Sequence, residues 1–277
     1  MVLAMKSPGA LGVSLLVLDR EARARLMSPW FYVVTSMVCL ASWVYGAGFQ
    51  QTFVTESVLV TTDPLMALNV AVVVFLSIVL ALRLAASMAW EREHRTLEVL
   101  LVAPAGWGAI IAGKFAAEVA VLIVTIAIYA VYLFLAQPLG QGVVGLYEIA
   151  GLAVIPLFGL PTLALALLVG AFARSVRAAV VLFLTLIILL TAFELALGVL
   201  NAVDPNDLSL FDLYLRASLE IAAPIVRPLS AMAELARPIE AVVAQAPITS
   251  AQSVWALALT FGTLVFADVA GRTRGAV

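Results

Sequence analysis

Long apolar stretches alternate with short charged segments along the chain. Six of the stretches reach the length of about 20 helical residues that is needed to cross the ~30 Å hydrocarbon core of a bilayer. They cover residues 29–49, 65–89, 109–136, 149–173, 178–200 and 251–270. They lack the alternation of barrel strands, and a backbone in lipid must satisfy its own hydrogen bonds. The pattern predicts an all-α, polytopic membrane protein with six transmembrane helices.

An amphipathic helix is predicted over residues 10–27, just before the first span. The apolar positions that can share one face are Leu15, Leu16, Leu18, Ala22 and Leu26, and the basic positions assigned to the opposite face are Arg20, Arg23 and Arg25. Ser28-Pro29 then interrupts the helix. Basic amphipathic helices next to a span usually lie in the membrane interface, with their cations near anionic headgroups. We therefore interpret this segment as an interfacial helix rather than as a partly solvated tail.

One connection is much longer than the others and is predicted to contain helices of its own. Residues 201–250 show helical apolar spacing over Leu208–Ile221 and again over Leu229–Ala244. The prolines that bound these two segments are Pro205, Pro224, Pro228 and Pro247. We expect short helices that cover the outer mouth of the bundle. No linker or shift in composition divides the chain, so residues 1–277 are predicted to form a single domain.

The composition agrees with a membrane protein. Hydrophobic residues make up 64% of the 277 residues and charged residues 12%, and the mean hydropathy is +1.14. A soluble domain carries about 25% charged residues. The net charge of −2 provides no basic surface for nucleic acid, so nucleic-acid-binding proteins are excluded. We therefore expect membrane lipid to surround most of this chain.

The positions of Lys and Arg predict the orientation. With an even number of spans, both termini lie on one side of the membrane, and ten of the 15 basic residues fall on that side. These are Lys6, Arg20, Arg23, Arg25, Arg92, Arg95, Arg174, Arg177, Arg272 and Arg274. Three basic residues, all within 201–250, fall on the other side. Because cytoplasmic loops carry the excess of Lys and Arg, both termini are predicted to be cytoplasmic.

Several charged residues lie within predicted spans, where an unpaired charge is costly, and four of them lie in the second, third and fifth spans. Arg83 and Lys114 are close enough to the cytoplasmic boundary to extend their charged groups towards it. Glu118 could pair with Lys114, four residues earlier, or with Arg83 on the second span. Glu194 lies about 9 Å below the outer surface at 1.5 Å per residue and is expected to face the bundle interior or a water-filled cavity. All four are candidates either for a translocation path or for pairing between helices.

A charged segment followed by a short helix connects the second and third spans. It begins at Trp90-Glu91-Arg92-Glu93 and ends at Pro104. Thr96 is a suitable N-cap, and Leu97 and Leu101 can share one helical face. A helix of this kind suits the groove of a partner protein. A loop whose charges only fix the membrane topology explains the same residues.

The order Glu91-Arg92-Glu93, Thr96-Leu97-Glu98, Pro104 and Gly113-Lys114 resembles the signature of ABC-2-type transporter permeases. Arg95 stands where that family usually has glycine. The resemblance extends to the N-terminal elbow helix, the six spans and the outer helices before the last span. It implies that the segment is a coupling helix seated in a cytoplasmic ATPase. The residues implied in coupling are Glu91, Arg92, Glu93, Thr96, Leu97, Glu98, Leu101 and Pro104.

The resemblance implies the permease subunit of an ATP-driven exporter in the bacterial inner (cytoplasmic) membrane. Its implied partners are a separate ABC ATPase, which binds ATP and Mg, and a second copy of the permease or a homologous one. This chain is expected to hold no cofactor and no ATPase site. Gly108 to Lys114 fits part of a phosphate-binding loop, but Phe115 stands where the loop needs a hydroxyl. The apolar spans suit lipid, haem, drug or glycan passage.

A stand-alone carrier driven by an ion gradient is the alternative that the sequence leaves open. Glu118 and Glu194 would then be its proton sites. Pro156 and Pro161, within the fourth predicted span, are compatible with the broken helices of such carriers. A multi-histidine metal enzyme is excluded because His94 is the single histidine.

Overall fold

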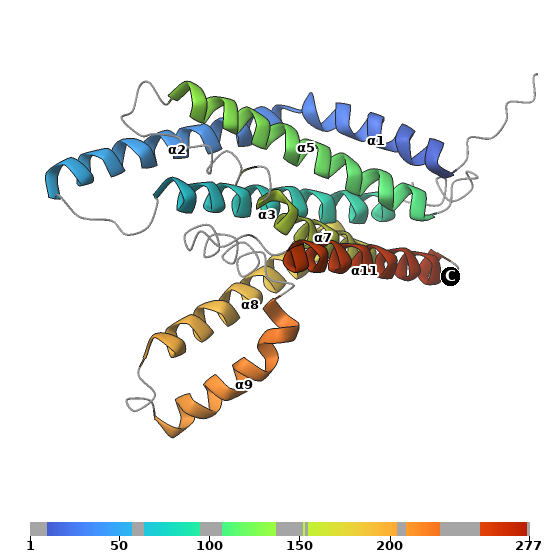
Figure 1. Cartoon of the computed structure of the whole chain (residues 1–277). Helices are drawn as coiled ribbons and strands as arrows, with labels where there is room; N and C mark the ends of the chain where they lie inside the picture. Colours follow the sequence, from blue (N-terminus) through green and yellow to red (C-terminus); the bar gives the residue numbers. More distant parts are fainter. Residues whose placement is uncertain are drawn as a thin grey trace, which may run out of the picture.

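The computed structural model of the chain describes residues 10–56, 64–94, 107–136, 152, 155–203, 209–227 and 250–275 (Figure 1). The elements are α1 (Ala10–Leu26), α2 (Pro29–Glu56), α3 (Pro64–Glu93), α5 (Trp107–Ala136), η1 (Ile155–Gly159), α7 (Leu160–Phe172), α8 (Val176–Ala202), α9 (Leu210–Val226) and α11 (Ser250–Gly275). The described residues contain helices and no strand, which confirms the all-α class.

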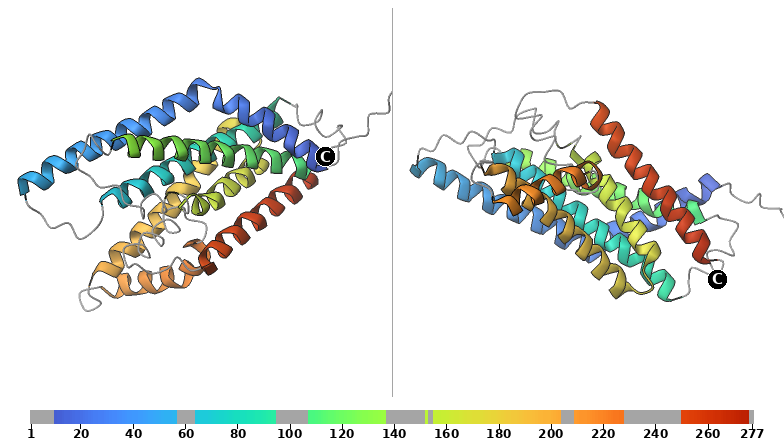
Figure 2. Two further views of the ribbon diagram at one scale, coloured as in Figure 1. Left: turned by 45° about the horizontal axis from the view of Figure 1, so that its top comes forward. Right: turned by 90° about the horizontal axis from the view of Figure 1, so that it is seen from below.

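The central helix of the bundle is α3. It packs most extensively against α7 and α8 and also contacts α5, while α11 packs on α7 and α1 packs on α5 (Figures 1 and 2). The side chains of Leu76, Leu84 and Met88 on α3 are fully buried together with Leu163 and Leu167 of α7. Two groups of helices result, α1 with α5 and α3 with α7, α8 and α11, and they meet where α5 packs on α3, α7 and α11.

Three described helices are long and apolar enough to span a membrane. They are Leu68–Glu93, Trp107–Ala136 and Val176–Ala202. A fourth span is possible by the same measure if the pair Gly12–Leu26 and Pro29–Tyr45, bent by 62°, counts as one. The structure therefore confirms a multi-pass membrane protein. The count of six spans stays a prediction.

Glycines let two pairs of helices approach closely. A Cβ atom on Gly113 of α5 would lie 2.8 Å from Val17 Cβ and 2.9 Å from the carbonyl oxygen of Ser14, both on α1. A Cβ atom on Gly170 of α7 would lie 2.8 Å from the carbonyl oxygen of Ala85 on α3. A larger residue at either position would force the helices apart. Small residues thus fix both the α1–α5 and the α3–α7 contacts.

The predicted span 149–173 contains a change of helix type. Apart from the single residue Leu152, its described part begins with the 3₁₀-helix η1, and α7 starts only at Leu160, with Pro161 in its first turn. Proline has no backbone N–H and fits the first turn of a helix but not its interior. Pro156 and Pro161 therefore explain why a single α-helix does not run through this region.

The helix α1 agrees with the predicted range, but one basic position assigned to its polar face is buried. Leu15 and Leu16, assigned to the apolar face, are both 64% exposed, which is compatible with a face turned towards lipid, and Arg20 and Arg23 are also exposed. Arg25, assigned to the opposite face, is buried against α5. The assignment of Arg25 was wrong, because ion pairs with Glu118 of α5 and with Glu21 of its own helix hold it in the interior. The interfacial location of α1 stays a prediction.

Helices α8 and α9 form a hairpin that projects from the rest of the bundle (Figure 1). The predicted helix Leu208–Ile221 corresponds to α9, which begins with a capping box between Ser209 and Asp212. This helix continues past Pro224, which was expected to end it, because a proline in the last turn removes only a single hydrogen bond. The predicted helix Leu229–Ala244 lies outside the described residues.

Candidate functional site

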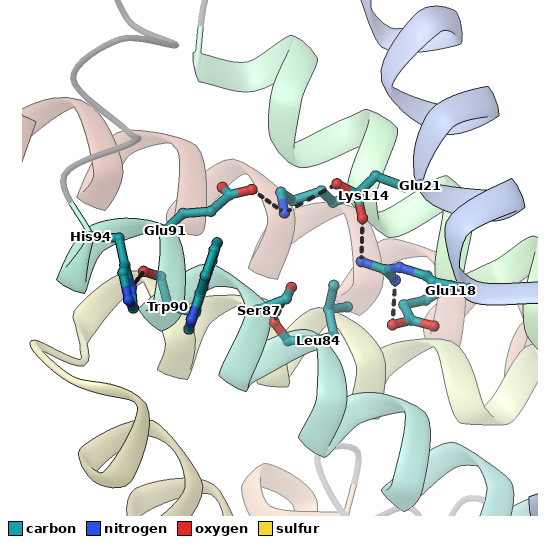
Figure 3. Close-up of polar contacts among 9 residues, drawn as sticks. Glu21, Leu84, Ser87, Trp90, Glu91, His94, Lys114 and Glu118 are labelled. Atoms are coloured by element: carbon teal, nitrogen blue, oxygen red, sulfur yellow. Dashed lines mark hydrogen bonds and ion pairs between the residues drawn. The ribbon is translucent and has the colours of Figure 1, made fainter. Parts of the chain in front are cut away.

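Five charged side chains from three helices meet at one end of the bundle and form what we call the charged cluster. They are Glu21 and Arg25 of α1, Glu91 of α3, and Lys114 and Glu118 of α5. Lys114 Nζ lies 2.7 Å from Glu91 Oε1 and 3.7 Å from Glu21 Oε1 (Figure 3). Arg25 Nη2 lies 3.2 Å from Glu21 Oε2, and Arg25 Nη1 contacts the Glu118 carboxylate. Acids and bases thus alternate from α3 through α5 to α1.

Helical spacing explains how the cluster assembles. Glu21 and Arg25 are four residues apart on α1, and Lys114 and Glu118 are four residues apart on α5, so each pair lies on one face of its helix. The two helices run in the same direction. Glu21 therefore meets Lys114 and, one turn further along, Arg25 meets Glu118. Each turn brings an acid opposite a base.

Three of these charged side chains are almost completely buried, so the loss of a partner would be energetically costly. Arg25, Lys114 and Glu118 are 3%, 2% and 0% exposed. Removing one partner of a buried ion pair is strongly destabilising, because the other charge is left without compensation. Arg83 on α3 is half-buried and close enough to interact electrostatically with Glu118. With Arg83 included, the group carries three acids and three bases and has no formal net charge.

The direct ion pair of Glu118 has neither of the partners that the sequence suggested, although one of them, Arg83, is close enough to interact with it electrostatically. Lys114 contacts Glu91 and Glu21 rather than Glu118, and the ion pair of Glu118 is with Arg25. The sequence analysis missed Glu21 and Arg25 because it treated their helix as lying apart from the spans. The matching four-residue spacings on the two helices were the available signal. These spacings predict the ion pairs only when α1 and α5 are known to be parallel neighbours.

The two residues that follow Glu91 bind the opposite side of the bundle. Arg92 Nη1 donates hydrogen bonds to the carbonyl oxygens of Ala171 and Ala173, at 2.6 and 3.2 Å, where α7 ends. The backbone N–H of Val176, the first residue of α8, donates to Glu93 Oε2 at 3.1 Å. A cation is favourable at a helix C-terminus and an anion at an N-terminus. Arg92 and Glu93 therefore complement the two helix ends that they contact.

The predicted coupling residues divide at the end of α3. Glu91, Arg92 and Glu93 are described, and they connect α3 to α5, α7 and α8. Thr96, Leu97, Glu98, Leu101 and Pro104 lie outside the described residues. His94, the last described residue before them, lies against Trp90 with the ring centroids 4.3 Å apart (Figure 3).

Glu194, near the opposite end of the bundle, has a cation as partner. Its carboxylate lies 3.5 Å from Arg227 Nε, directly after α9, and the two side chains are 17% and 38% exposed. The pair connects the two helices of the α8–α9 hairpin. The sequence analysis named no partner for Glu194, because this cation comes from the long connection after the span.

A neutral polar contact was also missed. The Tyr129 hydroxyl of α5 donates to Asn69 Oδ1 of α3 at 3.1 Å, and both side chains are completely buried. This hydrogen bond joins the two helix groups far from the charged cluster. Among the described residues, no group of three or more His, Cys, Asp or Glu side chains could hold a metal ion.

Comparison with known proteins identifies one family. A family model described as "ABC-2 family transporter protein" matches residues 15–270, a range that includes every residue of the charged cluster. No curated protein matches this chain.

Proposed function

This chain belongs to the ABC-2 family of transporter proteins, and we propose that it is the permease subunit of an ATP-driven exporter. In this proposal a separate cytoplasmic ATPase binds ATP and Mg and docks on residues 90–104. A second permease, identical or homologous, completes the translocation path. The complex lies in the bacterial inner membrane with both termini of this chain in the cytoplasm.

The observation that carries the proposal is the position of Glu91-Arg92-Glu93. These three consecutive residues end α3 immediately before residues 95–106, which contain the predicted coupling helix. Glu91 binds Lys114 of α5, whereas Arg92 and Glu93 bind the ends of α7 and α8. A force applied to residues 95–106 would thus reach both groups of helices within one helical turn.

The proposed mechanism follows from this connection. Closure of the ATPase on ATP moves the 95–106 segment, and the end of α3 moves with it. The motion changes how the α1–α5 group packs against the group around α3, and the path switches from inward-facing to outward-facing. The protein contributes no catalytic residue, because hydrolysis takes place in the ATPase.

The docking step is tested by the substitution Glu98→Lys. Reversing this charge should uncouple ATP hydrolysis from transport, because Glu98 is assigned to the surface that the ATPase grips. The measurement compares ATPase activity with export in inverted vesicles containing the full complex. The matched control is Glu220→Lys, an exposed glutamate on α9, which is predicted to lie on the outer side of the membrane. Normal coupling in Glu98→Lys would refute the assignment of this residue.

Purification of the tagged chain in mild detergent tests the proposal as a whole. A co-purifying nucleotide-binding subunit with ATP hydrolysis is expected. A chain that purifies alone, without ATPase activity, would instead favour the gradient-driven carrier. The two carboxylates assigned to proton transfer in that alternative, Glu118 and Glu194, both have cationic partners in the structure.

A further inference from the structure

Lys114 has two carboxylate partners on two different helices. Its ammonium lies 2.7 Å from Glu91 of α3 and 3.7 Å from Glu21 of α1. The two acids lie on either side of it (Figure 3). A shift of about 1 Å would therefore exchange the closer partner for the more distant one.

We propose that Lys114 is a two-position switch between the two helix groups. In one position its ammonium binds Glu91 and holds the end of α3 against α5. In the other it binds Glu21, and the end of α3 is released. The proposal rests on the proposed function for the movement that drives the exchange, but the switch itself belongs to this chain.

The other contacts confine the movement to the end of α3, because α5 also packs on α11 and is joined to the start of α3 by the Tyr129–Asn69 hydrogen bond. Arg92 and Glu93 attach the end of α3 to α7 and α8, so these three helices move together. On the other side, α1 stays on α5 through the contact of Arg25 with Glu118 and through the close packing of Gly113. The Lys114–Glu91 pair crosses the boundary between the two groups.

The second acid makes the exchange possible. A buried ammonium that lost Glu91 without a replacement would be strongly unfavourable. Glu21 removes that obstacle because it already lies within 4 Å of Lys114. Glu21 can accept the ammonium while Arg25 keeps its contact with Glu118. Both positions of Lys114 thus keep a carboxylate beside the buried charge, as a two-state element requires.

The switch predicts opposite effects of two isosteric substitutions. Glu91→Gln should favour the released position, because Glu21 becomes the single acid partner of Lys114 within the cluster. Glu21→Gln should favour the attached position for the corresponding reason. Each variant is expected to change the ratio of the two populations by on the order of tenfold, a usual size for coupling between sites.

The populations can be measured as distances between spin labels in the purified full-length chain in lipid nanodiscs. The labels are attached to Leu16→Cys on α1 and His94→Cys at the end of α3, both exposed, in a Cys39→Ser background. Glu91→Gln should enrich the longer distance and Glu21→Gln the shorter one. No ATPase is present in this experiment. A negative result would therefore refute the switch without refuting the exporter function, and a positive result would support the switch even if the exporter function proved wrong.

The matched control is Asp19→Asn, which removes an acid from the exposed side of the same helix, 2.9 Å from Arg23. It should leave the distance distribution unchanged. Shifts of Glu91→Gln and Glu21→Gln in the same direction, or no shift beyond the control, would overturn the switch. Glu91→Asp and Glu21→Asp, which keep the charge on a shorter side chain, form a second pair. They should give smaller shifts in the same opposite directions, and their failure to do so would also overturn it.

Discussion

At the scale of single residues, the charged cluster keeps its charges in the interior by pairing them. Glu118 is completely buried, and its ion-pair partner Arg25 comes from a helix that was predicted to lie outside the bundle. A buried ion pair adds little net stability compared with apolar residues in its place. Removing only one member is strongly destabilising, because the other charge stays buried without a partner. Stability should therefore respond to single and to double substitutions in different ways.

Replacing either member of this pair is expected to destabilise the protein. Arg25→Met or Glu118→Met leaves the other charge buried and should lower the free energy of unfolding by about 3–5 kcal/mol. The double variant should be clearly more stable than either single variant, because neither buried charge of the pair remains. Thermal unfolding in detergent, analysed as a double-mutant cycle, measures the coupling.

The exposed pair on the same helix provides the control. Asp19 and Arg23 are paired at 2.9 Å with side chains 56% and 72% exposed. Asp19→Asn should cost less than about 1 kcal/mol, as is usual for exposed pairs. A double variant in which the losses of Arg25→Met and Glu118→Met simply add would show that the two residues are not coupled.

At the scale of elements, close packing decides which helix faces meet. The backbone of α1 approaches α5 at Gly113, and this contact places Glu21 and Arg25 beside Lys114 and Glu118. Gly198 on α8 shows the opposite situation, because a Cβ atom there would meet nothing within 4 Å. A methyl group would therefore clash with α1 at Gly113 but would meet no neighbouring atom at Gly198.

Gly113→Ala should separate α1 from α5. The added methyl group would overlap Val17 and the backbone of α1, and overpacking of this kind costs roughly 1–3 kcal/mol. Gly198→Ala, in contrast, should be neutral or stabilising by up to about 1 kcal/mol, since alanine is the better helix former. Thermal unfolding of the two variants measures the difference. Equal stabilities would contradict the close contact between α1 and α5.

The sequence predicted the helices better than their contacts. Apolar runs gave the ranges of α3, α5 and α8, because any helix that crosses lipid must be apolar over about 20 residues. The same rule cannot say which face of a span meets a neighbour, since lipid and protein interior are both apolar. The error on Arg25, which was assigned to the polar face of α1 but is buried, has this origin.

At the scale of the whole molecule, polar contacts tie together the end of the bundle where α3 terminates. Ion pairs join α1, α3 and α5, and hydrogen bonds join α3 to α7 and α8. Asp268 of α11 also lies close to the start of α5, 3.1 Å from the position of a Cβ atom on Gly108. We expect this end to move as a few rigid groups when the predicted coupling segment moves.

The orientation of this end can be tested with an impermeant thiol reagent in a Cys39→Ser background. Leu210→Cys at the start of α9 should be labelled in spheroplasts with an intact inner membrane, because α9 is predicted to lie on the outer side. Leu16→Cys on α1 should be labelled only after permeabilisation. Both side chains are exposed in the structure, so burial does not limit the reaction. The reverse pattern of labelling would invert the predicted topology.

By itself, the sequence determined that the chain is helical and lies in a membrane, because lipid leaves few options for a long apolar backbone. It also contained the ordered motif of the ABC-2 family. The tertiary structure alone decided the partners of the buried charges, Glu118 with Arg25 and Lys114 with Glu91 and Glu21. Helical spacing places charges on a face, but only packing decides which two faces meet. An ion pair between segments distant in the sequence depends both on helical spacing and on packing, and the candidate site consists of such pairs.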